Sequence, residues 1–296
     1  YTKAINLDPD NSKDYYERGN AYSYLGENEN SIIDYTKAIE FDPQNSKAYF
    51  HRGRSYEDLG QNENSMSDYT KVIELDSENG NAYFRRGIVY GNLAEPENSI
   101  SDYTKAIELN PNDVYIYVQR GSAYSELNDL DKAVEDYTKA IALDVDNLSV
   151  YFMRGMAYDG LNSYKEAADD FSAVIERQNN PPNPAYFYRA EAYSMLGKYQ
   201  DAINDLTYML DLKDVKSDEK YMSECYFNRA LCYTNIGKYE EAYDDLSCVI
   251  DIDPDDVQAY HYRSMVSFKN DDLLDYLADT GMVRKLDPEY YEKHLS

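Results

Sequence analysis

Side chains that could perform catalysis or bind a metal are few and scattered in this chain. The histidines are His51, His261 and His294, and none has a second histidine or cysteine at the spacing of a zinc site. The sequence contains neither a Gly-x-Ser-x-Gly nucleophile motif nor a phosphate-binding glycine loop. We therefore predict that the protein is not an enzyme, that it has no metal site and that it uses no cofactor.

The three cysteines are the other candidates for chemistry. Cys225, Cys232 and Cys248 lie within one stretch of the chain, and an odd, sparse number argues against a disulfide framework. Cys225 and Cys232 are seven residues apart on one expected helix, too far apart for a bridge within it. We expect the cysteines to be small, apolar, buried side chains.

The charge balance limits the possible partners. The chain of 296 residues contains 56 acidic and 29 basic residues, which gives a net charge of −27. Such a surface repels nucleic-acid phosphates and anionic lipids, so we expect no nucleic acid and no membrane surface as a partner. No apolar run approaches the roughly 18–20 residues of a membrane span, so no membrane insertion is expected. The sequence assigns no compartment, although the cytoplasm is favoured.

Arginine and aspartate recur as two matched series. The arginines are Arg18, Arg52, Arg86, Arg120, Arg154, Arg189, Arg229 and Arg263. The aspartates are Asp34, Asp68, Asp102, Asp136, Asp170, Asp205, Asp245 and Asp279. A partly buried arginine needs a nearby carboxylate to compensate its lost hydration. We predict that the two series pair across helical hairpins as a structural ladder.

A repeat of 34 residues positions these charges. The glycines at its centre are Gly19, Gly53, Gly87, Gly121 and Gly155. Tyrosines such as Tyr83 and Tyr90 are seven residues apart and therefore share one face of a helix. The glycine between them lets the next helix approach closely. Two helices in a 34-residue unit indicate a solenoid of helical hairpins.

The repeat predicts how the chain is organised. Residues 1–11 form a truncated unit that contains only a second helix. Residues 12–256 contain seven full units, namely 12–45, 46–79, 80–113, 114–147, 148–181, 183–216 and 223–256. Residues 257–296 form a degenerate capping unit and tail, because Ser267 replaces a repeated tyrosine and Tyr276 stands where alanine is usual. The irregular joins at 179–184 and 212–222 have two interpretations. They are functional segments, either hinges or surfaces for a partner, or they are loops whose sequence is free to vary.

The pattern resembles the tetratricopeptide repeat (TPR) family. The residues that carry the resemblance in one unit are Tyr83, Gly87, Tyr90, Ser99, Tyr103, Ala106 and Pro111. The resemblance implies an all-α fold, a right-handed superhelical α-solenoid of helix-turn-helix hairpins whose first helices line a concave groove. It also implies a non-enzymatic scaffold for protein–protein interaction. The repeated arginine before the central small residue departs from the leucine that is usual in the family.

The resemblance also implies which residues face the groove. We predict a partner-binding groove formed by Phe50, Arg54, Phe84, Arg85, Ile88, Phe152, Met153, Met156, Phe187, Met195, Phe227, Leu231 and Met265. A surface rich in Met and Phe can adapt to the apolar side chains of a peptide. For the phenylalanines a second interpretation stays open, which is packing between neighbouring units. His51, Arg54 and Arg85 form a basic spot that could hold a carboxylate.

We therefore predict a scaffold that binds a protein or peptide, basic or apolar, along its concave groove. Two alternatives stay open because Tyr1 begins in the middle of a repeat. In one, this chain is the substrate-recruiting arm of a larger enzyme or assembly whose other domains lie outside this sequence. In the other, the exposed half-hairpin at Tyr1 stacks on another copy, which would give end-to-end self-association.

Overall fold

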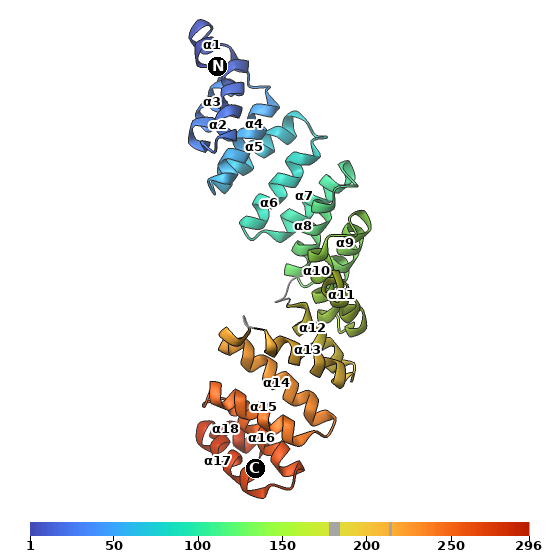
Figure 1. Cartoon of the computed structure of the whole chain (residues 1–296). Helices are drawn as coiled ribbons and strands as arrows, with labels where there is room; N and C mark the ends of the chain where they lie inside the picture. Colours follow the sequence, from blue (N-terminus) through green and yellow to red (C-terminus); the bar gives the residue numbers. More distant parts are fainter. Residues whose placement is uncertain (178–183, 213–214, 296) are drawn as a thin grey trace. The chain divides into compact units, whose positions relative to one another are not determined.

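The computed structural model describes residues 1–177, 184–212 and 215–295, and within these ranges it contains helices and no strand (Figure 1). The chain divides into two compact units, Tyr1–Val150 and Tyr151–Ser296. Each unit is a stack of helical hairpins in which most helices pack against the next along the chain. The predicted class, an all-α solenoid of helical hairpins, is confirmed for each unit.

The first unit begins with a single short helix and continues with hairpins. Its helices are α1 (Thr2–Leu7), α2 (Ser12–Tyr24), α3 (Asn28–Phe41), α4 (Ser46–Asp58), α5 (Asn62–Leu75), α6 (Gly80–Asn92), α7 (Pro96–Leu109), α8 (Val114–Glu126) and α9 (Leu130–Leu143). Helix α10 (Leu148–Gly160) begins in this unit and continues into the second.

The second unit contains the remaining hairpins and a final short helix. Its further elements are α11 (Tyr164–Arg177), α12 (Ala185–Met195), α13 (Tyr199–Asp211), the 3₁₀ turn η1 (Val215–Ser217), α14 (Glu219–Asn235), α15 (Tyr239–Ile252), α16 (Val257–Lys269), α17 (Leu273–Leu286) and α18 (Pro288–His294). Among the described residues, no helix has the length and apolar character needed to cross a membrane.

Local sequence signals set where the helices begin and end. The side chain of Asn45 accepts a hydrogen bond from the backbone N–H of Ala48 (3.0 Å) and so caps the start of α4. Pro96 occupies the first turn of α7, where its missing N–H costs nothing. Gly26 ends its hairpin turn at φ 75°, as predicted. Ala94 and Asp271 adopt the same left-handed conformation, which their side chains did not suggest.

The contact between a small residue and an aromatic ring holds each regular hairpin together. A Cβ atom added to Gly87 would lie 2.6 Å from Cε1 of Tyr103, whose side chain is buried. A Cβ atom added to Gly121 would likewise lie 2.8 Å from Cε1 of Tyr137. Most of the repeated tyrosines are therefore explained by packing of the hairpins.

The predicted arginine–aspartate ladder is present in the structure. In one hairpin, Arg52 donates from Nε to Oδ2 of Asp68 (2.8 Å) and from Nη2 to Oδ1 (2.7 Å). Its Nη1 donates to Oγ1 of Thr36 in the preceding hairpin (3.0 Å). All eight predicted pairs form ion pairs. The guanidinium also lies over Tyr49 and Tyr56, at 5.5 and 5.9 Å from the ring centroids.

The irregular joins leave this ladder intact. Arg189 still donates to Ser172 (3.0 Å) across the first join, and Arg229 donates to Thr207 (3.0 Å) across the second. Residues 179–183 and 213–214 of these joins lie outside the described residues. In the second join, η1 buries Val215, and α14 begins at Glu219, ahead of the unit predicted to start at residue 223.

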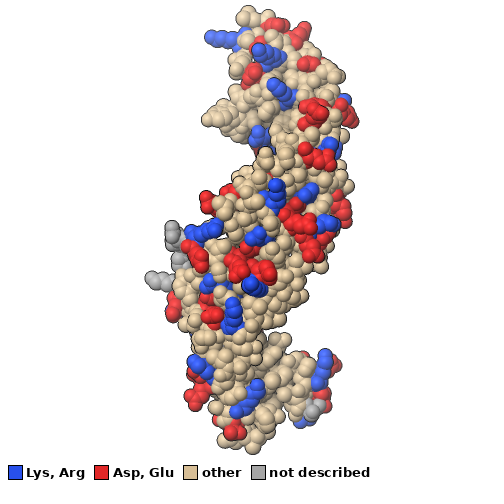
Figure 2. All heavy atoms as spheres, turned by 90° about the vertical axis from the view of Figure 1, so that its right-hand side faces the viewer, with Lys and Arg blue, Asp and Glu red and all other residues tan. Residues whose placement is uncertain are grey.

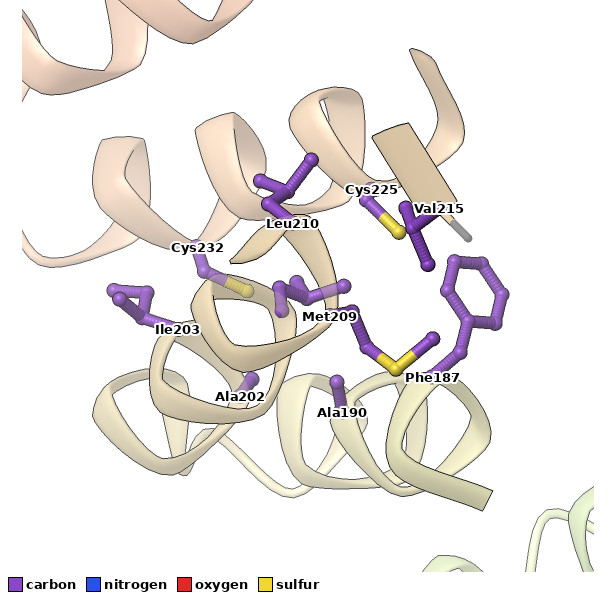
Figure 3. Packing of buried hydrophobic residues seen from close by; sticks show 10 residues of the cluster. Phe187, Ala190, Ala202, Ile203, Met209, Leu210, Val215, Cys225 and Cys232 are labelled. Atoms are coloured by element: carbon purple, nitrogen blue, oxygen red, sulfur yellow. The ribbon is translucent and has the colours of Figure 1, made fainter. Parts of the chain in front are cut away.

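A cluster of buried residues forms the core around α12, α13 and α14 (Figure 3). Figure 3 shows Phe187, Met209, Val215 and Cys225 gathered between these elements. Cys225 and Cys232 are buried free thiols, as expected. Cys248 is only half-buried, so the expectation of full burial is wrong for that residue.

Candidate functional site

The predicted groove residues of the first unit pack mainly against their own hairpins. The ring of Phe50 lies 5.6 Å from that of Tyr69, and the ring of Phe84 lies 5.9 Å from that of Tyr103. Ile88 also packs on the buried cluster around Tyr103. These side chains are half-buried, whereas the side chain of Arg54 is exposed. The rings thus contribute to the core as well as to the surface.

The basic spot expected around His51, Arg54 and Arg85 contains one arginine that is already paired. Nη1 of Arg85 donates to Oε1 of Glu57 (3.1 Å), and the hydroxyl of Tyr69 donates to Oε2 of the same carboxylate (2.8 Å). Burial lowers the pKa of His51 and so favours its neutral form. The charge of Arg85 is thus compensated within the protein, and an anion site at this spot stays a prediction.

In the second unit, the predicted methionines are exposed while the predicted phenylalanines pack inward. The exposed fractions are 37% for Met153, 36% for Met156, 62% for Met195 and 41% for Met265.

The phenylalanines of the second unit make ring contacts with neighbouring helices. Phe152 lies 5.6 Å from Tyr188, and Phe227 lies 5.3 Å from Tyr262. Phe187 is only 8% exposed and belongs to the core cluster. Most of the surface of these rings is therefore buried against neighbouring helices, which agrees with the second interpretation given above.

Two predicted groove residues, Met195 and Leu231, line one cavity of about 340 Å³. Helices α10 to α14 all contribute to it. Its lining residues are Asp159, Tyr164, Ala190, Glu191, Ser194, Met195, Leu206, Asn228, Leu231 and Cys232. We call it the Glu191 cavity. Apolar side chains form much of its wall, and the carboxylates of Asp159 and Glu191 lie among them.

A second cavity of about 410 Å³ shares two lining residues with the first, Glu191 and Asn228. It brings together Phe187 and Phe227 from the predicted groove. Its lining residues are Phe187, Tyr188, Glu191, Ser223, Glu224, Phe227, Asn228, Asp256 and Gln258. We call it the Phe227 cavity. Among the described residues, no lysine, arginine or histidine lines either cavity.

The electrostatics of the shared residue Glu191 are unusual. The pKa of the Glu191 carboxyl is raised to about 7, first by burial and then by the nearby charges of Asp159 and Glu224, whereas a hydrogen bond from Asn228 opposes the shift. On the face shown in Figure 2, by contrast, acidic and basic side chains are interspersed. The charged side chains that line the two cavities are therefore all acidic, whereas both signs of charge occur on this face.

Sequence reasoning did not select Glu191, Asp159 or Asn228 as site residues. A signal for Glu191 was present. Glu191 is the one carboxylate at the ninth position of the first helix, compared across the seven full repeats and the degenerate last one. The residues at this position in the other repeats are Asn20, Arg54, Ile88, Ser122, Met156, Leu231 and Met265. Within the described residues, no group of His, Cys, Asp and Glu side chains is arranged to hold a metal ion.

Five models of the TPR family, described as TPR repeat or tetratricopeptide repeat, match the chain. They cover residues 19–60 and 121–161, 80–113 and 223–256, 1–32 and 102–135, 46–79, and 152–211. The chain therefore belongs to the tetratricopeptide repeat family. Repeats of this family generally serve as scaffolds for protein interactions, and a protein-interaction scaffold is the class of protein that the fold defines.

Solved structures support the same assignment. The protein MamA is 26% identical, with a TM-score of 0.54 over 56% of this chain and 91% of its own. YrrB, described as a TPR protein with an unusual peptide-binding site, is 23% identical, with a TM-score of 0.57 over 65% of this chain and 97% of its own. A TPR protein from Parabacteroides merdae is 18% identical, with a TM-score of 0.57 over 86% and 98%. No curated protein matches the chain.

Proposed function

We propose that the protein is a scaffold that binds an extended peptide segment of a partner protein through the second unit. The observation that supports this proposal is the pair of adjoining cavities that share Glu191 and Asn228. Together they collect Met195, Leu231, Phe187 and Phe227 from four separate positions of the predicted groove. YrrB, a TPR protein of similar fold, has an unusual peptide-binding site, which agrees with this function.

The physical case rests on shape and on exposed apolar surface. A concave site with apolar walls and a few polar groups is the usual form of a site for a small ligand or a side chain. Met195 is 62% exposed and can change rotamer easily, so it can fit different partner side chains. Alternate side chains of an extended peptide point the same way, about 7 Å apart, which suits two adjoining cavities.

A library of random 12-residue peptides displayed on phage tests this function. Selection on the folded chain should enrich a set of related peptides. Their affinity should fall about tenfold or more in a Met195→Ser/Leu231→Ser double variant, because the apolar wall of the Glu191 cavity is lost. A Leu273→Ser/Leu274→Ser variant is the matched control, since both leucines are exposed and line neither cavity. Absence of enrichment, or equal loss in both variants, would contradict the proposal.

A further inference from the structure

The Glu191 cavity combines an apolar wall with negative charge, and a long cationic side chain is complementary to both. Met195 and Leu231 supply apolar wall, while Asp159 and Glu191 supply negative charge. Lysine and arginine carry an aliphatic stem and a cationic head, and they bury the stem along apolar surface while the head stays in polar surroundings. A purely apolar side chain would leave the two carboxylates without a counter-charge.

Within the part of the chain that the structure describes, no cationic side chain lines this cavity. From α10 Asp159 faces it, from α11 Tyr164, and from α14 Asn228, and the charge of Glu224 on α14 also acts on Glu191. All of these groups are neutral or acidic near neutral pH.

Two of the ladder arginines lie on α12 and α14, which line the cavity, and both are already paired with aspartates. Arg189 on α12 is paired with Asp205, and Arg229 on α14 is paired with Asp245, each at 2.7 Å. Neither arginine lines the cavity. Among the described lining residues, none therefore balances the charge of Glu191.

We propose that the Glu191 cavity takes a lysine or arginine side chain of the bound segment, while an apolar residue of the same segment enters the Phe227 cavity. This assignment rests on the proposed function and specifies the chemistry of the partner. The cationic head would form charge-assisted hydrogen bonds with Glu191 and lie near Asp159. Phe187 and Phe227 would contact the neighbouring apolar residue.

Binding of such a segment is coupled to proton release. Because the pKa of Glu191 is raised to about 7, roughly nine in ten molecules carry a neutral Glu191 at pH 6. The bound cation requires the ionised carboxylate, so the pKa of Glu191 falls when the cavity is filled. Affinity should therefore be about tenfold lower at pH 6 than at pH 8.

Two synthetic peptides provide the direct test. Both have blocked ends and the sequence Ala-Leu-X-Met-Leu-Ala, where X is lysine in one and norleucine in the other, so they differ in charge at nearly equal length. Calorimetric titration at pH 8 should show the lysine peptide binding about tenfold or more tightly. The preference should shrink at pH 6. Glu191→Gln should abolish it at both pH values, whereas Glu219→Gln, an exposed carboxylate on α14 outside both cavities, should retain it.

The outcomes separate this inference from the proposed function. Equal affinity for the two peptides, or a lysine preference that survives in Glu191→Gln, overturns the inference while peptide binding itself stands. If neither peptide binds, the carboxyl ¹³C signal of Glu191 decides the question. Nα-acetyl-lysine amide added at millimolar concentration should lower the apparent pKa of Glu191 in a saturable way, and no shift overturns the inference.

Discussion

Arg86 holds Asp102 through two parallel hydrogen bonds and reaches back to Thr70 with a third. Nε donates to Oδ2 at 2.7 Å, Nη2 donates to Oδ1 at 2.8 Å, and Nη1 donates to Oγ1 of Thr70 at 3.1 Å. Arg86 on α6 and Asp102 on α7 belong to the same hairpin, whereas Thr70 on α5 belongs to the hairpin before. One side chain thus connects three helices and ties each hairpin to its predecessor.

Replacement of Asp102 by Asn should destabilise the protein strongly. The side chains of Arg86 and Asp102 are 17% and 8% exposed, so Asp102→Asn leaves a largely buried guanidinium without its counter-charge. We expect a loss of about 3 kcal/mol in the free energy of unfolding, measured by urea denaturation.

The exposed ion pair Lys105–Glu108 on the same helix is the control for this experiment. Its two side chains are 45% and 58% exposed, at an Nζ–Oε2 distance of 2.8 Å. Glu108→Gln should change the free energy of unfolding by less than about 0.5 kcal/mol. Equal effects of the two substitutions would show that the ladder does not contribute to stability.

Two glycines of α6 should respond to alanine in opposite directions. In Gly87→Ala the new Cβ would lie 2.6 Å from the ring of Tyr103, so we expect a loss of about 1–3 kcal/mol. In Gly91→Ala the new Cβ would lie 3.6 Å from Oγ of Ser99, an ordinary contact distance, and the better helix propensity of alanine should stabilise the protein by about 0.5–1 kcal/mol. Thermal unfolding of both variants measures the difference. A loss in Gly91→Ala as large as that in Gly87→Ala would count against the ring contact.

Glu191 should make stability fall as pH rises through neutrality. Its pKa is raised to about 7 in the folded chain, above the value near 4.3 of an unfolded chain. The folded state therefore favours the protonated carboxyl, and the stability that this provides is lost as pH increases from about 4 through 7. Glu191→Gln should raise Tm at pH 8 and change it little at pH 5. An equal rise at both pH values would indicate that titration of Glu191 is not the cause.

The thiols should differ in their reactivity. Burial raises the pKa of Cys225 to about 12 and also raises the pKa of Cys232, so neither forms a thiolate readily. Cys248 is half-buried and accessible in part. A disulfide reagent at pH 8 should modify one thiol per native chain slowly and all three in urea, and Cys248→Ser should remove the native reaction. Modification of three thiols in the native protein would mean that the core around α13 opens easily.

The sequence predicted the fold and the ladder because both depend on repetition. A contact such as Gly87 with Tyr103, or Arg86 with Asp102, recurs at a fixed spacing, so chance coincidence is excluded by the number of copies. Local rules also identified most hairpin turns, such as the one at Gly26. Ala94 departs from these rules, because it adopts the left-handed conformation at φ 57° although it is neither glycine nor asparagine.

The candidate site was less predictable because it depends on where the repeats differ. Arg85 looked free in the sequence, yet Glu57, 28 residues earlier, neutralises it. Phe187 looked like a groove residue, yet an extra turn of α14 places Tyr221 against it, with ring centroids 5.4 Å apart. Glu191 carries an ordinary carboxyl, and only its neighbours on other helices give it an unusual pKa.

The hydrogen bond from arginine to the preceding hairpin recurs at a fixed spacing, so each regular 34-residue repeat carries both the donor for the repeat before it and the acceptor for the repeat after it. Thr70 and Arg86 are 16 residues apart, and so are Thr104 and Arg120. If residues 80–113 were duplicated in place, Arg86 of the new copy would meet Thr104 of the original at that same separation. Gene segments of 34 codons can therefore be added or removed without leaving a donor unmatched. Such a chain can change its length in evolution, or in an engineer's hands, one whole unit at a time.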